Sequence, residues 1–144
     1  MATFKTLHAE GSIPMPIPFD QAVVAERMEY AIGAALGAED IIILGFLPED
    51  CVPTDLVVDT DAMGGSCAAK VGLLNADGDD LEGTPWVAAA ALAAAGGVRA
   101  DAAGLRAMAR LPASDKPRPV AMYVNVLGTA TTGKVGVTLQ YRAV

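Results

Sequence analysis

The segment that most resembles a catalytic motif is GTATTGK, at positions 128–134. A nucleotide-binding P-loop has the pattern G-x-x-x-x-G-K followed by Ser or Thr, whose hydroxyl holds magnesium, and then a helix. Here Val135 stands where the hydroxyl is needed, and the alternating residues after it predict a strand. We therefore interpret the segment as a flexible hairpin loop and not as a nucleotide site.

Acidic residues near position 77 have a spacing that metal ions use. Asn75, Asp77 and Asp79 follow the i, i+2, i+4 pattern of a calcium loop, but the Gly and Glu that an EF-hand needs at its sixth and twelfth positions are missing. A solvated turn is the default interpretation, because Asn, Asp and Gly are typical turn residues. A weak calcium site outside the EF-hand class, built from Asp77, Asp79, Asp80 and Glu82, stays open beside it.

No other group of residues has the composition of a catalytic centre. His8 is the only histidine, which argues against histidine acid–base catalysis and against a site with several histidine ligands. Ser66 lacks the glycine two residues later that a nucleophile elbow requires. Cys51 and Cys67 have no histidine nearby to complete a zinc pattern and are expected to be buried thiols, with a disulfide between them as the alternative. We predict a protein that is not an enzyme and that uses no metal or other cofactor.

The composition limits the partners of the chain. Hydrophobic residues make up 53 % of the 144 positions, but aromatic residues only 5 %, which provides few faces for stacking sugars or bases. The net charge of −7 and the pI of 4.5 argue against binding nucleic acid. No apolar run reaches the ~20 residues of a membrane helix, and the first residues do not resemble a secretory signal. We expect a soluble protein made in the cytoplasm, with no membrane partner.

Several segments have the pattern of strands. Three short apolar runs, at 41–47, 51–59 and 67–74, are separated by loops rich in Pro, Gly and acidic residues and predict a small antiparallel sheet. Alternating apolar residues predict two further strands near the C-terminus, with Val120 and Met122 on one face of the first. The predicted buried face of the last strand contains Val135, Val137, Leu139 and Tyr141. The predicted core is Ile41, Ile43, Val58, Val71, Leu73, Val124, Val126, Val137 and Leu139.

Two segments carry helical features. Thr84 as N-cap, Pro85 in the first turn, an alanine-rich run and Gly96 as a stop predict a short helix over 85–95. Trp86 is expected to seat this helix on the sheet. Residues 22–36 fit either a helix with an apolar residue every fourth position or a strand, and propensity favours the helix.

Residues 1–20 differ from the single domain expected over 21–144. Pro14, Pro16 and Pro18 alternate with apolar residues and hold this segment extended, while preventing it from forming a central strand. Such an arm either packs along its own domain or reaches onto a neighbouring molecule, and both alternatives stay open. Its predicted partner-binding residues are Phe4, Leu7, Ile13, Met15, Ile17 and Phe19.

The order of the segments resembles that of small virion proteins of tailed bacteriophages. The likeness covers roughly residues 22–144 and rests on LGFLP followed by CVPTDLVVDTD, on KVGLLNADGDDL and on the closing GKVGVTLQYRAV. Among these proteins, the chain is most similar to capsid cement or decoration proteins, which implies a jelly-roll-like β-sandwich. The resemblance also implies that residues 22–36 form a strand leading into the run at 41–47.

We therefore predict a mainly β protein, an antiparallel jelly-roll-like sandwich with one short Ala-rich helix and an extended Pro-rich arm. The resemblance implies a structural virion protein on the capsid exterior, which binds the major capsid protein of a tailed phage as a homo-oligomer, a dimer or a trimer. Such a protein would stabilise contacts between neighbouring subunits through repeated seating on a symmetric lattice. The alternative is a small β-sandwich module that binds carbohydrate or calcium, such as a phage adhesin or tail-associated domain.

Overall fold

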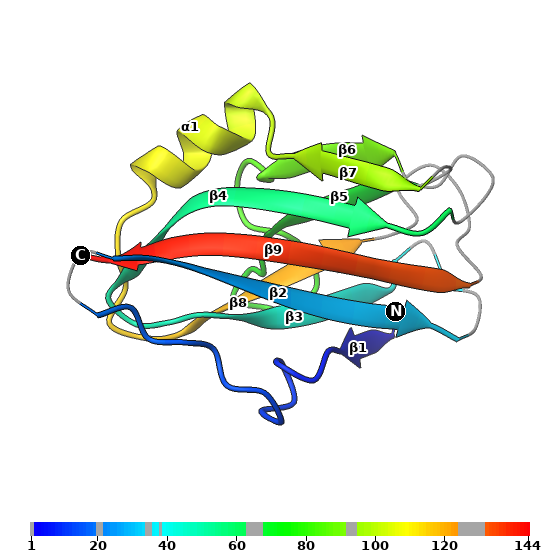
Figure 1. The fold of residues 1–144 in the computed structure, drawn as a ribbon, viewed down its shortest axis with the longest axis horizontal. Helices are drawn as coiled ribbons and strands as arrows, with labels where there is room; N and C mark the ends of the chain where they lie inside the picture. The colour runs from blue at the N-terminus through cyan, green and yellow to red at the C-terminus, as the bar shows by residue number, and fades with distance from the viewer. Residues whose placement is uncertain are drawn as a thin grey trace.

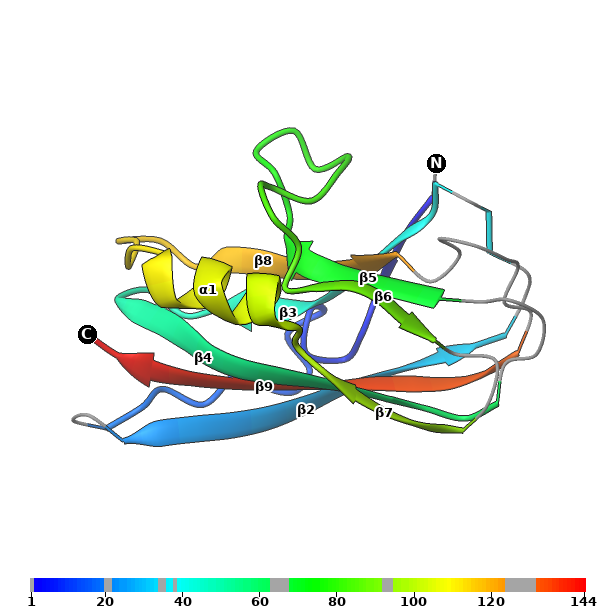
Figure 2. The same ribbon diagram turned by 90° about the horizontal axis from the view of Figure 1, so that it is seen from above.

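The computed structural model of the chain describes residues 2–19, 22–33, 36–37, 39–62, 68–91, 95–123 and 132–144. Their strands form two stacked sheets, which Figure 2 shows as separate layers. The five-stranded sheet contains, in spatial order, β1 (Thr3–Lys5), β3 (Ile41–Leu47), β8 (Arg118–Tyr123), β5 (Ala68–Leu73) and β6 (Val87–Ala91). The four-stranded sheet contains β2 (Val23–Ile32), β9 (Gly133–Ala143), β4 (Cys51–Thr60) and β7 (Gly96–Arg99).

The strand pairing is that of a jelly roll. Strand β2 pairs with β9, β3 with β8, β4 with β7 and β5 with β6, all antiparallel, as if one long hairpin had been rolled up. The pairs β4·β9 and β5·β8 then join the hairpin segments within each sheet, and only β1 lies parallel to its neighbour, β3. Two four-stranded layers connected in this way define the jelly-roll architecture. The predicted jelly-roll-like sandwich is confirmed (Figure 1).

Strand β9 runs through the centre of the four-stranded sheet and follows the predicted alternation. Val135, Val137, Leu139 and Tyr141 are all fully buried, while the residues between them face outward. Its ten-residue register with β2 is uninterrupted. Residues 22–36, which fitted both a helix and a strand, thus contain a strand from Val23 to Ile32, as the family resemblance implied.

The core lies between the sheets and confirms most of the predicted residues. Val58, Val71, Leu73, Val137 and Leu139 are buried, whereas Val124 and Val126 lie outside the described residues. In β3, Ile41 is fully buried as predicted, but the residues that enter the main core are Ile42, Leu44 and Leu47. Ile41 and Ile43 instead belong to a second, smaller cluster with Leu81, Ala121 and Tyr123 on the other face of the five-stranded sheet. The loop between β5 and β6, which projects from that sheet in Figure 2, covers this cluster.

The three central runs are strands, but they do not form one sheet. The runs at 41–47 and 67–74 supply β3 and β5, whereas the run at 51–59 supplies β4 in the opposite layer. The interpretation of positions 128–134 as a hairpin loop is also wrong, since β8 and β9 lie in different sheets. Most of that connection falls outside the described residues, as does Cys67. Cys51 is a free, buried thiol, and burial raises its pKa.

The predicted position of the helix is wrong. Residues Val87–Ala91 form β6, which pairs with β5, and the helix of the described chain is α1 (Ala102–Arg110). Alanine favours a helix by only a few tenths of a kcal/mol per residue over most residues, so pairing with an open sheet edge overrides it. The N-cap of α1 is Asp101, whose carboxylate accepts from the Gly104 N–H at 2.7 Å.

The prediction that Trp86 seats its own helix on the sheet is wrong, since Trp86 directly precedes β6 and packs beside α1 instead. The indole is 3 % exposed in the main core with Met108 of the helix. A Cβ on Gly104 would lie 1.8 Å from the Trp86 carbonyl oxygen, so glycine is what allows the helix to approach this closely. At nine residues, α1 is too short to cross a bilayer, and no described helix has the length and apolarity to do so.

Candidate partner-binding surface

The arm, residues 2–19 of the structure, lies against its own domain. Thr3, Phe4 and Lys5 pair with Ile41, Ile42 and Ile43, which extends the five-stranded sheet by one short strand. Beyond β1, which is the edge strand of the five-stranded sheet, the chain continues along the side of the molecule where β2 is the edge strand of the other sheet (Figure 1). It thereby covers the open side of the sandwich.

One side of the arm is fitted to the domain by apolar and polar contacts. The Phe4 ring packs on Tyr30 with 5.9 Å between centroids. His8 is 6 % exposed, and its Nε2 lies 2.8 Å from Oε1 of Glu26 on β2. Met15 packs against the main core. For these side chains, the first of the two alternatives therefore holds: the arm packs along its own domain.

A hydrogen bond fixes the proline-rich end of the arm. The Tyr141 hydroxyl, on β9, donates to the carbonyl oxygen of Pro16. Burial raises the pKa of Tyr141, so its hydroxyl keeps its proton throughout the neutral range and stays a donor. A proline-rich segment makes few hydrogen bonds of its own, and this contact ties it to the centre of a sheet.

The other side of the arm exposes apolar side chains. Ile17 is 83 % exposed and Phe19 is 89 % exposed, whereas Pro18 between them is buried. Leu7 and Ile13 are also exposed. Exposed apolar side chains gathered on one segment are typical of an interaction site. We call Leu7, Ile13, Ile17 and Phe19 the arm surface.

The structure thus divides the six predicted partner-binding residues into two groups. Phe4 and Met15 pack against their own domain, and the other four remain exposed in this chain. Their binding to a partner stays a prediction. Val23 is also exposed, but it lies at the start of β2, on the same outward face as Arg27 and Glu29.

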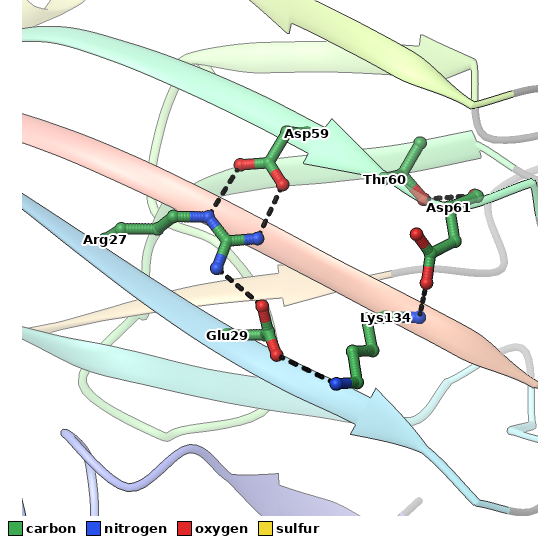
Figure 3. A network of polar contacts seen from close by, with 6 residues as sticks. All are labelled: Arg27, Glu29, Asp59, Thr60, Asp61 and Lys134. Atoms are coloured by element: carbon green, nitrogen blue, oxygen red, sulfur yellow. Dashed lines mark hydrogen bonds and ion pairs between the residues drawn. The ribbon is translucent and has the colours of Figure 1, made fainter.

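A second surface, on the outer face of the four-stranded sheet, has the opposite character. Arg27 of β2 reaches across β9 to Asp59 of β4, with Nη2–Oδ1 and Nε–Oδ2 distances of 2.6 and 3.0 Å (Figure 3). Its Nη1 also lies 2.5 Å from Glu29, whose carboxylate is 3.8 Å from Lys134 Nζ. Bonds to Asp59 and then to Glu29 raise the pKa of Arg27 above its ordinary value. We call Arg27, Glu29, Asp59 and Lys134 the paired-charge face.

Gly136 makes the crossing of Arg27 feasible. It lies on β9, between the two strands that Arg27 connects, and a Cβ there would lie 2.2 Å from Arg27 Nη2. Any other residue at this position would push the guanidinium away from the sheet. Charges on this face are therefore satisfied within the chain and require no partner.

The acidic loop after β5 is a closed turn. The Asn75 side-chain oxygen accepts from the N–H groups of Gly78, Asp79 and Asp80 at 2.8, 3.1 and 3.4 Å, and its amide nitrogen donates to Asp79 Oδ1 at 2.8 Å. The amide that a calcium loop would use as a ligand thus holds the backbone instead. Within the described ranges, no three His, Cys, Asp or Glu side chains come together in an arrangement able to hold a metal ion.

A cleft of about 770 Å³ lies between the end of α1, the β5–β6 loop and the start of β8. Glu82, Arg110 and Arg118 are among its lining residues. The Arg118 guanidinium donates to the carbonyl oxygens of Pro112 and Cys51 at 3.0 and 3.1 Å, so it joins the linker after α1 to β4. The arginine therefore serves the backbone of this chain and does not present a free cation to the cleft.

No protein-family model and no curated protein sequence matches the chain. Solved structures do match, among them two from phage capsids. A chain in the structure "Capsid of Ralstonia phage GP4" is 25 % identical, with a TM-score of 0.84 over 99 % of both chains. A chain in "Cyanophage Pam1 capsid asymmetric unit" is 17 % identical, with a TM-score of 0.62 over 93 % of this chain and 96 % of that one, and it supports the fold alone. The similarity to the first spans the full length, arm included, and confirms the predicted resemblance to a phage capsid-associated protein.

Proposed function

We propose that this chain binds the outside of an icosahedral phage capsid and stabilises contacts between neighbouring major capsid protein subunits. The observation that carries the proposal is the arm surface, where Ile17 and Phe19 are almost fully exposed on a segment held against its own domain. Full-length similarity to a chain of a phage capsid supports a structural role in the virion and not an enzymatic one.

The apolar side chains of the arm surface are suited to binding a capsid shell, on which the same contact is repeated many times. Burying an isoleucine or phenylalanine side chain contributes about 1.5–3 kcal/mol, so two such anchors give a modest affinity per copy. A dimer or trimer that seats several arms at once would bind a repeating lattice far more tightly than one copy. Modest contacts repeated over a shell are sufficient for a protein that stabilises it.

In this arrangement the paired-charge face points to solvent. Burying its four charged side chains against a partner would cost desolvation free energy. Because these side chains already bond to one another, a partner would offer no new bonds to offset that cost. A charged, internally paired surface turned outward also stays hydrated and exposes no apolar patch on a decorated particle.

Co-sedimentation with empty shells of the cognate major capsid protein tests the proposal. The full chain should sediment with the shells at saturable stoichiometry and raise their melting temperature. The double variant Ile17→Ser/Phe19→Ser should bind at least a hundredfold more weakly, since it loses two apolar anchors. Its own melting temperature should not change, because neither side chain is packed in this chain.

Val98→Ser is the matched control for this experiment. Val98 is also an exposed apolar residue, but it lies on β7, at the opposite edge of the four-stranded sheet from β2. This variant should sediment like the unmodified chain. A full chain that stays in the supernatant between 50 mM and 500 mM salt would exclude the proposal, and a saturable calcium or glycan response would then favour a binding module.

A further inference from the structure

The arm is attached to the domain at several points along its length. After the β1·β3 pairing, the Thr6 hydroxyl, 2 % exposed, donates to the carbonyl oxygen of Leu44. His8 meets Glu26 two residues later, and Tyr141 meets Pro16 near the far end. The contacts come from three different strands, β3, β2 and β9, and each holds a different part of the arm.

A notch in β3 receives the middle of the arm. A β-bulge interrupts the register of β3 and β8 between Ile43 and Gly45. A Cβ on Gly45 would lie 2.6 Å from Met28 Sδ, 3.2 Å from Met15 Sδ and 3.5 Å from His8 Cβ. Gly45 therefore leaves the space in which two arm side chains meet the core.

These attachments determine which arm residues face outward. Met15 enters the notch, the Pro16 carbonyl points to Tyr141 and Pro18 is buried, which leaves Ile17 and Phe19 on the outside. Each proline fixes one φ angle, so the orientation set at Pro16 extends to its neighbours on both sides. The arm surface is thus held in one arrangement before any partner arrives.

We infer that Tyr141 and Glu26 are positioning residues for shell binding, which act by holding the arm in its binding arrangement without touching the shell. This inference rests on the proposed function. A free arm would lose conformational entropy on binding, whereas an arm already ordered on its domain does not pay that cost again. Loss of an attachment should therefore weaken binding although the contacting side chains are unchanged.

Tyr141→Phe tests the inference at the proline-rich end. The variant keeps the buried ring but removes the donor to Pro16, and it leaves a carbonyl without its partner. We expect roughly tenfold weaker co-sedimentation with shells, at a temperature at which the variant is folded. Chymotrypsin should cleave the free protein faster after Phe19, which reports release of the proline-rich end of the arm independently of the shell.

Tyr123→Phe is the matched control. It removes a tyrosine hydroxyl that also donates to a backbone carbonyl, that of Asp79 at 2.6 Å, but in the loop on the five-stranded sheet. The control should show the shell affinity and the arm cleavage rate of the unmodified chain. Equal losses in both variants would mean that general loosening of the fold, and not arm position, weakens binding.

A second pair of variants tests Glu26. Glu26→Ala removes the acceptor of His8, whereas Glu26→Gln keeps a side-chain oxygen that can accept from Nε2. The alanine variant should weaken binding severalfold and expose the arm to chymotrypsin, and the glutamine variant should retain most of both properties. If Glu26 only stabilised the fold, Glu26→Ala would lower the melting temperature together with the shell affinity. Weaker binding at an unchanged melting temperature, restored by Glu26→Gln, is therefore the result that a merely structural role would not give.

The outcomes separate the two proposals. Faster cleavage of Tyr141→Phe at unchanged shell affinity would overturn the positioning role while leaving the shell-binding proposal intact. Unchanged cleavage would also overturn it, because Tyr141 would then not hold the arm. If the unmodified chain does not bind shells at all, both proposals are wrong, whatever the arm does.

Discussion

The arm surface and the paired-charge face differ in what they leave unsatisfied. On the paired-charge face, Arg27 has carboxylate partners on two strands, so its exposed side chain is already fully engaged. On the arm surface, Ile17 and Phe19 are more exposed and have most of their apolar area in water. Exposure alone therefore does not identify a binding surface. The informative property is whether the exposed group has found its partner within the chain.

Strand β2 carries part of the paired-charge face on one side and contacts the packed side of the arm on the other, because its side chains alternate. Arg27 and Glu29 point outward to the paired-charge face, while Glu26, Met28 and Tyr30 point inward to the arm and the core. A one-residue shift in its register with β9 would exchange these two sets. The unbroken ten-residue pairing with β9 prevents that exchange.

The largest expected contrast is between two phenylalanines of the arm. Phe19→Ala should weaken shell binding by about 2 kcal/mol, roughly thirtyfold, and leave the free energy of unfolding unchanged. Phe4→Ala should lower the free energy of unfolding by about 2–3 kcal/mol, because its ring packs on Tyr30 and the core. Shell titrations and denaturant unfolding measure the two effects. Equal stability losses in both variants would contradict the division of the arm into a packed and an exposed side.

A smaller effect is expected at Gly136. Gly136→Ala places a methyl group where the Arg27 guanidinium lies, so the bidentate contact with Asp59 is lost. Exposed ion pairs contribute little, and the expected cost is about 1 kcal/mol of unfolding free energy with no change in shell affinity. Gly97→Ala in the same sheet is the control, since a Cβ there meets only the Val58 carbonyl oxygen at 3.5 Å. Reduced shell binding by Gly136→Ala alone would place the paired-charge face at the contact.

The strands were predictable where alternation and burial agree. In β9, four apolar residues at every second position fix both the strand and its buried face. In β3, the run IIILGFL is apolar on both faces, and the sequence pattern does not distinguish the main core from the cluster under Leu81. The alanines of β6 lack the β-branched residues that mark a strand, so only the sheet edge of β5 determines their conformation.

The extended, apolar character of the arm was predictable from the sequence, but which of its side chains are exposed was not. Prolines at every second position indicated an extended, apolar segment. The division into packed and exposed side chains depends on partners far away in sequence, with Tyr141 125 positions from Pro16 and Gly45 on the bulge of β3. A local pattern does not carry such information, since nothing near Pro16 indicates that its carbonyl oxygen accepts a hydrogen bond from a tyrosine hydroxyl.

The smallest expected effect is the different response of the two surfaces to salt. Apolar contacts are not screened, so raising NaCl from 0.1 to 1 M should leave shell binding through the arm unchanged or strengthen it slightly. The same change should lower the free energy of unfolding by a few tenths of a kcal/mol through the paired-charge face. Arg27→Met should lose this salt sensitivity, because Asp59 and Glu29 then have no guanidinium to contact. A shell affinity that falls steeply with salt would instead mean that charged groups meet the shell, and the roles assigned to the two surfaces would have to be exchanged.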